Sequence, residues 1–344
     1  MKQRAHAWVA LRAYKLLDDS KQAPKLVELL SYYLSDVWDG SWLPDTQIGD
    51  MAYGHIYKMD SDPIMMGMKA IDPRFKQDYK TLKSKLTGNR VCLTYVKDSV
   101  ELNKPYCSDL NKGGHLPDRV IALSHTIADM LKLSDYPITF YAKGEVSKEY
   151  KKDLSQQTVK SLSLSPNFSA RQIALMFFIQ CHYICDAHMP LHADLRDYGS
   201  PNSKTRRLSK DLHPTIEETW EEFFPDKPEL ELHDYMTESI DDIVTKLPKA
   251  SVIEIDNNKN YNLATDVNKL KADTWSEMVE ITRTAYAVSR KWIDKSYKDA
   301  NEFSKIPGGQ EYTDDFKKVT NYIFHDAVES TARIWLNTWE TFIK

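Results

Sequence analysis

The chain has 344 residues, enough for one large domain or two ordinary ones with a sizeable buried core. Its hydrophobic fraction of 42% and charged fraction of 28% are typical of a globular protein. The formal charge of −4 gives no basic excess that would indicate a nucleic-acid or acidic-membrane surface. Only 11 glycines favour long helices over turn-rich sheets, and no apolar run approaches the ~18 residues needed to span a bilayer.

The amino-terminal stretch MKQRAHAWVALRAYKLL mixes His, Arg and Lys with its apolar residues, so it is not typical of a secretory signal peptide. The four cysteines, Cys92, Cys107, Cys181 and Cys185, do not have the spacing of a secreted disulfide scaffold. We therefore expect a cytoplasmic protein, or a secreted one if the numbered chain is a processed or re-started form.

Apolar residues recur at helical spacing along most of the chain, which predicts a single all-α domain over residues 1–344. Helices are predicted at 7–17, 24–35, 117–131, 169–188, 234–247, 262–295 and 314–342, with irregular stretches over 40–90 and 194–211. The helix over 169–188 is the most apolar, and Pro190 should end or kink it because proline lacks an amide hydrogen. Asp211 is expected to begin a further helix that has Pro214 in its first turn.

The strongest chemical pattern is the run HYICDAHMPLH, which begins at His182. His182 and Asp186 are four residues apart, so both project from one face of the apolar helix. Imidazole and carboxylate groups are good zinc ligands, and burying them is unfavourable unless a metal or a partner compensates. His192 lies beyond the proline and can face a different ion. A simple buried His–Asp hydrogen bond is the alternative, but the clustering of histidines favours a metal site.

Further candidate ligands precede and follow this run. His213 and Glu217 are again four residues apart, and with His192 they could complete a tetrahedral zinc site that has water in the fourth position. Upstream, Asp45 and His55 lie in loops that could bring them together, although Asp45 alone is typical of a turn or a helix cap. The remaining candidates are Asp50, which competes for the role given to Asp45, and His6, which alone would be a packing or capping residue.

These segments, in this order, resemble the zinc-dependent phospholipase C family and the related zinc-dependent single-strand nucleases. The resemblance extends from His6 to Glu217, and its most specific part is the His-xxx-Asp-xxxxx-His core with Pro-Leu before the last histidine. The segment AHAWVALRAYKLL is similar to the family's first helix and IWLNTWETFI to its closing helix. The resemblance implies a largely helical fold that holds up to three zinc ions in a cleft.

Carried over by position, the resemblance implies three ligand sets in which Asp186 bridges the first two ions. The implied ligands are, in turn, Asp45, His55, His182 and Asp186; Met1, His6 and Asp186; and His192, His213 and Glu217. In the family the amino-terminal ligand is usually a residue exposed by removal of a signal peptide, often tryptophan. Here Met1 stands at the matching distance from His6, and His188 has no counterpart among the ligands.

The resemblance also implies a phosphodiester hydrolase, in which a zinc-activated water attacks phosphorus and Asp45 orients that water or accepts its proton. The pair His213-xxx-Glu217 favours phospholipase C-type cleavage of phospholipid headgroups, because the nucleases usually place aspartate at the second position. The loop DYGSPN beginning at Asp197 is instead similar to a nuclease loop, so single-stranded nucleic acid is the alternative substrate. Three aromatic residues close to His55 in the sequence could stack on a base, line a headgroup pocket or simply pack in the core: Trp42, Tyr53 and Tyr57.

Two other classes of protein compete with this prediction. One is a protein that retains zinc without catalysing a reaction. The other is a helical phosphohydrolase of the His-Asp doublet type, for which the chain offers His233-Asp234 and His325-Asp326 without a convincing set of partner ligands. Cys181 and Cys185 precede His182 and Asp186 by one position and are expected to be small buried apolar residues rather than ligands.

Overall fold

A computed structural model describes residues 1–48, 54–58, 116–134, 168–197, 208–224, 236, 274–293 and 309–343. Within these ranges the chain forms helices and turns and no β-strand, which confirms the predicted helical class. The main helices are α1 (Gln3–Ser20), α2 (Pro24–Ser31), α3 (Val37–Gly40), α8 (Leu116–Leu133), α12 (Ala170–His188), α13 (Pro190–Ala193), α14 (Leu212–Glu221), α18 (Thr274–Trp292) and α19 (Gly309–Ile343).

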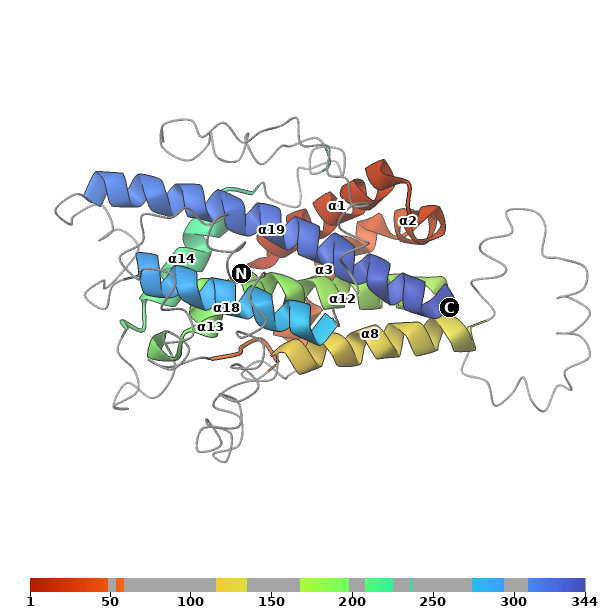
Figure 1. The fold of residues 1–344 in the computed structure, drawn as a ribbon. Coiled ribbons are helices and arrows are strands. Elements are labelled where there is room, and N and C mark those ends of the chain that lie inside the picture. Colours follow the sequence, from red (N-terminus) through yellow and green to blue (C-terminus); the bar gives the residue numbers. More distant parts are fainter. Residues whose placement is uncertain are drawn as a thin grey trace, which may run out of the picture.

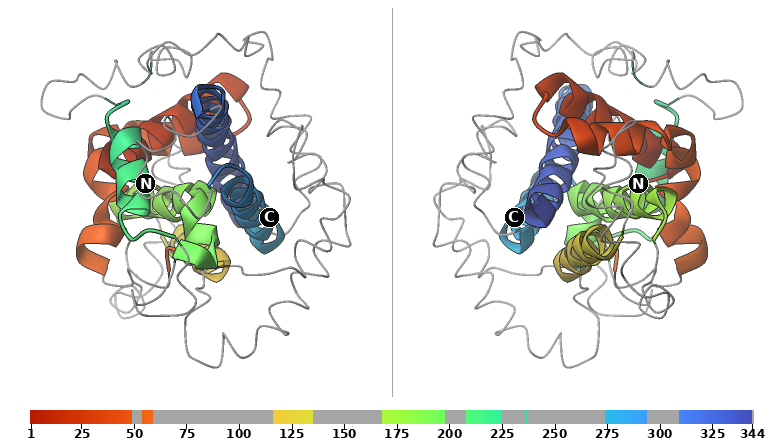
Figure 2. Two further views of the ribbon diagram at one scale, coloured as in Figure 1. Left: turned by 90° about the vertical axis from the view of Figure 1, so that its left-hand side faces the viewer. Right: turned by 90° about the vertical axis from the view of Figure 1, so that its right-hand side faces the viewer.

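Helix α12 is the centre of the bundle. It contacts α1, α3, α8, α18 and α19, and Figure 2 shows it among them when the molecule is seen end-on. In Figure 1, α19 runs along α12 and its carboxyl-terminal end meets α8 at one end of the bundle. Every α12 residue from Phe177 to His188 is buried, so the polar side chains in this part of the helix are shielded from solvent.

The ends of α12 follow from local sequence. Ser169 accepts a hydrogen bond from the Gln172 amide, and the Gln172 side chain accepts one from the Ser169 amide, which forms a reciprocal capping box. Met189 leaves the helix with extended backbone angles, and Pro190 starts the short helix α13 at its first position. The proline therefore ends α12, as predicted, and sends His192 in a new direction.

The other predicted helices that fall in the described residues lie where they were predicted, but some of their ends differ. Helix α1 begins four residues earlier than 7–17 predicts, at Gln3, and α2 ends at Ser31, where a 3₁₀ turn η1 (Leu34–Asp36) replaces the end of the predicted 24–35 helix. Helix α14 begins after Asp211 with Pro214 in its first turn. Apart from Met236, the predicted helix 234–247 lies outside the described residues, as does the 262–273 part of the predicted 262–295 helix.

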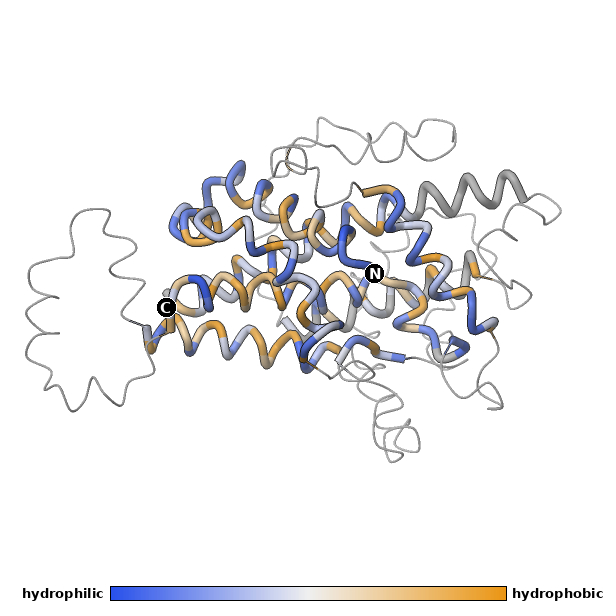
Figure 3. Tube along the Cα trace, turned by 180° about the vertical axis from the view of Figure 1, so that it is seen from behind, coloured by the Kyte–Doolittle hydropathy of each residue, from blue (hydrophilic) through white to orange (hydrophobic). Residues whose placement is uncertain are grey.

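The helices pack through a core of aliphatic and large aromatic side chains. Trp8, Phe177 and Trp335 come from α1, α12 and α19 and are fully buried together with many aliphatic residues. Figure 3 shows hydrophobic and hydrophilic stretches alternating along the helices, the pattern of elements that bury one face. Among the described helices, none combines the length and the apolar character needed to cross a membrane.

Gly40, the last residue of α3, allows α3 to lie very close to α12. A Cβ atom at this position would lie 2.8 Å from the Leu175 Cδ1 and 3.1 Å from the Phe178 Cβ. The Leu175 methyl can move, but the Phe178 Cβ is fixed to the α12 backbone. The close approach matters because the next residues, Ser41 and the turn η2 (Pro44–Ile48), lead directly into the candidate site.

The substitution Gly40→Ala should therefore push α3 away from α12 and lower the free energy of unfolding by about 1–3 kcal/mol, the usual effect of overpacking. Thermal unfolding followed by circular dichroism measures this change. Ser35→Ala, at an exposed position of the neighbouring turn, is the matched control. A melting temperature for Gly40→Ala equal to that of the control would contradict the close-packing argument.

Candidate metal centre

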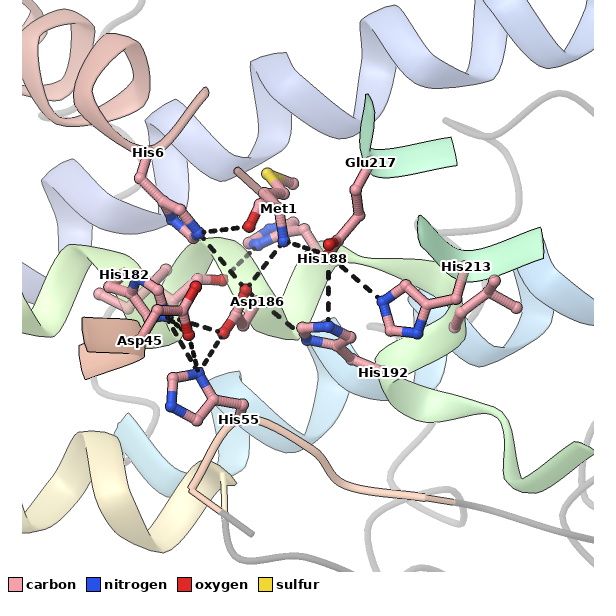
Figure 4. A network of polar contacts seen from close by, with 12 residues as sticks. Met1, His6, Asp45, His55, His182, Asp186, His188, His192, His213 and Glu217 are labelled. Atoms are coloured by element: carbon pink, nitrogen blue, oxygen red, sulfur yellow. Dashed lines mark hydrogen bonds and ion pairs between the residues drawn. The ribbon is translucent and has the colours of Figure 1, made fainter. Parts of the chain in front are cut away.

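Histidines and carboxylates from distant parts of the chain converge where α12 meets the amino terminus. Figure 4 shows their side chains pointing toward one another around Asp186. Among the described residues, three groups have donor atoms within 4.8 Å of one another and could each hold a metal ion. The first of these groups is Asp45, His55 and His182, the second is His6, His182 and Asp186, and the third is His192, His213 and Glu217.

The group around His55 has the dimensions of a tetrahedral zinc site once Asp186 is included. The Asp186 Oδ2 lies 2.7 Å from the His55 Nδ1 and 3.2 Å from the His182 Nε2. The two imidazole nitrogens are 3.0 Å apart, and the Asp45 Oδ1 lies 3.6 Å and 3.4 Å from them. Tetrahedral zinc with ligands at ~2.0–2.1 Å has edges of about 3.3–3.4 Å. The five spacings, 2.7–3.6 Å, bracket this edge length, so small side-chain movements would bring the donors around one ion.

The orientation of His182 is held by a backbone group. Its Nδ1 donates a hydrogen bond to the Ser41 carbonyl at 2.7 Å, which leaves the Nε2 of the neutral ring free to present a lone pair toward the other donors. Ser41 follows Gly40, so the close contact between α3 and α12 places this carbonyl. A metal-binding histidine usually has such an outer partner for its second nitrogen.

The second group lies at the amino terminus. The Met1 amine is fully buried and lies 3.1 Å from the Asp186 Oδ1, and the Met1 carbonyl oxygen accepts a hydrogen bond from the His6 Nε2 at 3.1 Å. The same His6 nitrogen is 3.6 Å from the Asp186 Oδ1. Helix α1 begins at Gln3, so His6 lies in its first turn and Met1 just before it, and both lie near the same carboxylate oxygen.

The third group joins α13 to α14. The Glu217 Oε1 lies 3.5 Å from the His192 Nε2 and 3.2 Å from the His213 Nε2. The Nδ1 of His213 donates to the Asp197 carboxylate at 2.8 Å. The one-turn spacing of His213 and Glu217 along α14 places them side by side, while the break at Pro190 brings His192 to face them.

Asp186 connects the groups because its two oxygens face different neighbours. The Oδ2 faces His55 and His182, whereas the Oδ1 faces Met1 and His6. A carboxylate with donors on both sides is suited to bridge two metal ions. Its side chain is only 2% exposed, so it needs positive charge close by to remain ionised.

In the metal-free protein, protons supply part of this charge. Burial lowers the pKa of the Met1 amine, but Glu217 and Asp186 outweigh that effect and raise the pKa from 8.0 to about 11. Burial likewise lowers the pKa of His182, yet the Asp186 and Asp45 carboxylates raise it to about 10. The Met1 amine lies between two carboxylate oxygens, 2.6 Å from the Glu217 Oε1, where a metal cation would have the same electrostatic role.

Burial and the neighbouring charges also shift the pKa values of two carboxylates and two further histidines. Burial would raise the pKa of Asp186 and Glu217, but the Met1 ammonium holds both well below their ordinary values, together with His182 for Asp186 and His213 for Glu217. Burial lowers the pKa of His192 to about 4, and burial together with His182 lowers that of His6 well below 6.5. Neutral imidazoles and ionised carboxylates are the protonation states that bind zinc.

Several candidates from the sequence stay outside these groups. His188 donates from its Nδ1 to the Ile184 carbonyl at 2.8 Å and lies 3.5 Å from Asp326, on the far side of α12. Asp326 thus contacts His188, while His325 faces Glu329, so this doublet is not part of a donor group among the described residues. Asp50, Tyr53 and the doublet His233-Asp234 lie outside the described residues.

The two cysteines of α12 are buried small residues, as predicted. Their sulfur atoms are 3.7 Å apart, and the Cys181 Sγ lies near the His6 carbonyl and the Thr331 hydroxyl rather than near the donor groups. Burial and the neighbouring Cys181 raise the pKa of the Cys185 thiol, which disfavours a zinc-binding thiolate. Of the aromatic residues, Tyr57 packs against the core, and the Trp42 ring lies 6.0 Å from those of both His6 and His182.

Sequence reasoning did not identify the groups that hydrogen-bond to the candidate donors or support them without being donors themselves. The Ser41 carbonyl carries no side-chain signal, and Lys58 and Asp197 are brought to His213 only by the tertiary fold. An aspartate near several histidines was a possible indication for Asp197, because metal-binding histidines often pair with a carboxylate.

Comparison with known proteins returned no family model, no curated protein and no solved structure that matches this chain. The functional argument therefore depends on the geometry of the donor groups and on the motifs that form them. Those motifs come from segments separated by more than a hundred residues, yet they supply histidine and carboxylate donors to one buried centre.

The raised pKa of His213 predicts how the metal-free protein responds to alkali. Burial lowers this pKa, but Glu217 and Asp197 raise it from 6.5 to about 9, so the folded state holds a proton that the unfolded chain releases above about pH 6.5. The resulting stabilisation is fully present below pH 6.5 and is lost as the pH rises through 9. In the presence of a chelator, the melting temperature should fall by several degrees across this window.

Zinc should reduce that fall, because the ion replaces the proton as the source of positive charge. The variant His213→Gln should give a flatter profile in chelator, whereas His125→Gln, at an exposed position of α8, should retain the wild-type profile. Equal melting temperatures at pH 6.5 and 9.5 in the metal-free wild type would contradict this account of the site.

Proposed function

We propose that this protein is a zinc-dependent phosphodiester hydrolase that cleaves phospholipid headgroups in the manner of a phospholipase C. The observation that carries the proposal is the shared carboxylate of Asp186, which has one donor group on each of its oxygens and a third group beside it. Clusters of closely spaced metal ions are used by phosphatases and nucleases to stabilise both the attacking and the leaving oxygen of a phosphoryl group.

The donor chemistry supports zinc. Histidine nitrogens and carboxylate oxygens in four-coordinate arrangements suit zinc better than the oxygen-rich, higher-coordinate sites of calcium or magnesium. The first group offers four such donors at spacings of 2.7–3.6 Å. The third offers three, His192, His213 and Glu217, so a water or a substrate oxygen could take the fourth position.

Asp45 is the residue best placed to take part in the reaction itself. Its side chain is 22% exposed, whereas those of His182 and Asp186 are nearly inaccessible. A carboxylate that reaches both solvent and the donor groups can orient a water and accept its proton while the water attacks phosphorus. Bound zinc would supply the positive charge that acidifies this water and neutralises the phosphoryl oxygens. The buried histidines and Asp186 then hold the donor geometry and exclude bulk water.

The choice of phospholipid over nucleic acid follows from the resemblance and from Glu217. The order of the donor segments, from His6 to Glu217, resembles the phospholipase C family, and glutamate at the last position favours that branch. The Glu217 Oε1 lies 3.5 Å from the His192 Nε2, 3.2 Å from the His213 Nε2 and 2.6 Å from the Met1 amine. Single-strand nuclease activity is the alternative.

Hydrolysis assays on zinc-loaded protein test this proposal. The three substrates are short-chain phosphatidylcholine, single-stranded DNA and RNA. We expect the protein to release phosphocholine from phosphatidylcholine. Asp45→Asn should lower kcat by about 100-fold or more, since it removes a proton acceptor from the reacting water. Asp129→Asn, at an exposed position of α8, is the matched control and should keep full activity.

Other outcomes assign the site differently. Nucleotide release without phosphocholine release would replace the phospholipase by the nuclease. Zinc binding with no hydrolysis of any of the three substrates would support a protein that retains zinc without turnover, and it would contradict the proposed activity.

A further inference from the structure

Lys58 is a buried lysine on the segment that also carries His55, and it contacts a neighbour of the third donor group. Lys58 is only 8% exposed, and its ammonium donates a hydrogen bond to the Leu191 carbonyl, one residue before His192. The same nitrogen lies 3.2 Å from the Asp197 Oδ2. Lysine is rarely buried unless it is paired, so this position needs an explanation in the surrounding charges.

Asp197 passes the effect of Lys58 on to a metal-binding candidate. Its Oδ2 accepts from both the Lys58 ammonium and the His213 Nδ1, the latter at 2.8 Å. A neutral imidazole that donates from Nδ1 keeps the lone pair on its Nε2. That Nε2 is the atom that faces Glu217 at 3.2 Å. The chain of contacts from Lys58 through Asp197 therefore sets which nitrogen of His213 is presented to the third group.

Contacts of the neighbouring residues also hold the segment that carries Asp197. The neighbouring Arg196 forms two-pronged contacts of 2.6–3.1 Å with the buried Asp194 carboxylate, which accepts a 2.7 Å hydrogen bond from the Ser289 hydroxyl of α18. The amide of Tyr57 donates to the His192 carbonyl at 3.1 Å. The short segment between His192 and Asp197 is thus hydrogen-bonded to Ser289 of α18 and to the Tyr57 amide.

We propose that Lys58 is a positioning residue for the third metal site, where through Asp197 it orients His213 for binding. The proposal rests on the proposed function in one respect, that the third group holds a metal ion. The Lys58 ammonium contacts the Leu191 carbonyl and the Asp197 carboxylate, and we assign it no step of the hydrolysis. Its role is to hold the Asp197 carboxylate in place and to tie the His55 segment to the His192 segment.

Zinc content and zinc affinity of full-length variants test this role. Lys58→Met removes the ammonium but keeps an unbranched side chain of similar length. We expect it to remain helical, to keep the zinc of the first two groups, and to bind the third ion about 10- to 100-fold more weakly, the usual effect of losing an outer partner. Elemental analysis and competition with a chromogenic chelator measure these quantities. Lys132→Met, at an exposed position of α8, is the matched control and should bind zinc as the wild type does.

Three further variants separate positioning from a general loss of stability. Lys58→Arg retains a cationic donor and should recover part of the affinity that Lys58→Met loses. Asp197→Asn should weaken the same third ion, and it tests the proposal even if Lys58→Met does not fold. The double variant should bind the third ion no more weakly than the worse single variant, because both residues act through His213. Cobalt substitution adds a spectroscopic readout, since the visible bands of cobalt report a changed ligand geometry.

The proposal is overturned if Lys58→Met and Asp197→Asn both retain the third zinc with wild-type affinity. It is also overturned if both lose all zinc ions equally, because the lysine would then support the whole fold rather than one site. The proposed hydrolase activity can fail separately: a wild type that binds three zinc ions but hydrolyses no substrate leaves the role of Lys58 intact.

Discussion

The burial of one carboxylate, Asp186, constrains the whole centre of this protein. An ionised carboxylate with a side chain 2% exposed is strongly unfavourable unless cations or donors surround it. Here the Met1 amine, His6, His55 and His182 all approach it, and the pKa of Asp186 is held well below its ordinary value despite burial. Because α12 runs through the middle of the bundle, partners of Asp186 come from the amino terminus and α1, from the segment of His55 and from α12 itself.

Two of the donor histidines are held in place by hydrogen bonds from outside the donor groups. Without these bonds, the imidazole rings could rotate away from the other donors. The Ser41 carbonyl orients His182, and Asp197 orients His213. Packing supports these contacts in turn, since the close approach at Gly40 places Ser41. Changes away from the donors can therefore disturb the donor geometry without altering a donor residue.

The sequence predicted the local parts of this arrangement well. Pairs one helical turn apart, His182 with Asp186 and His213 with Glu217, share a face by geometry alone, and Pro190 had to end the apolar helix. The neighbours of His213 could not be predicted in this way, because Lys58 and Asp197 meet only through tertiary packing. The Ser41 carbonyl is equally invisible to side-chain patterns. Asp45 joins the first group, while its competitor Asp50 lies outside the described residues.

The most direct test of the central claim is the zinc content of purified wild type and Asp186→Asn, measured by elemental analysis after equilibration with zinc and dialysis. Circular dichroism of both proteins shows whether the helices are retained. The account predicts two or three ions per chain in the wild type, and loss of those shared by Asp186 in the variant, with the ion of His192, His213 and Glu217 kept. A folded wild type that retains no zinc, or a variant with the same zinc content as the wild type, would contradict it.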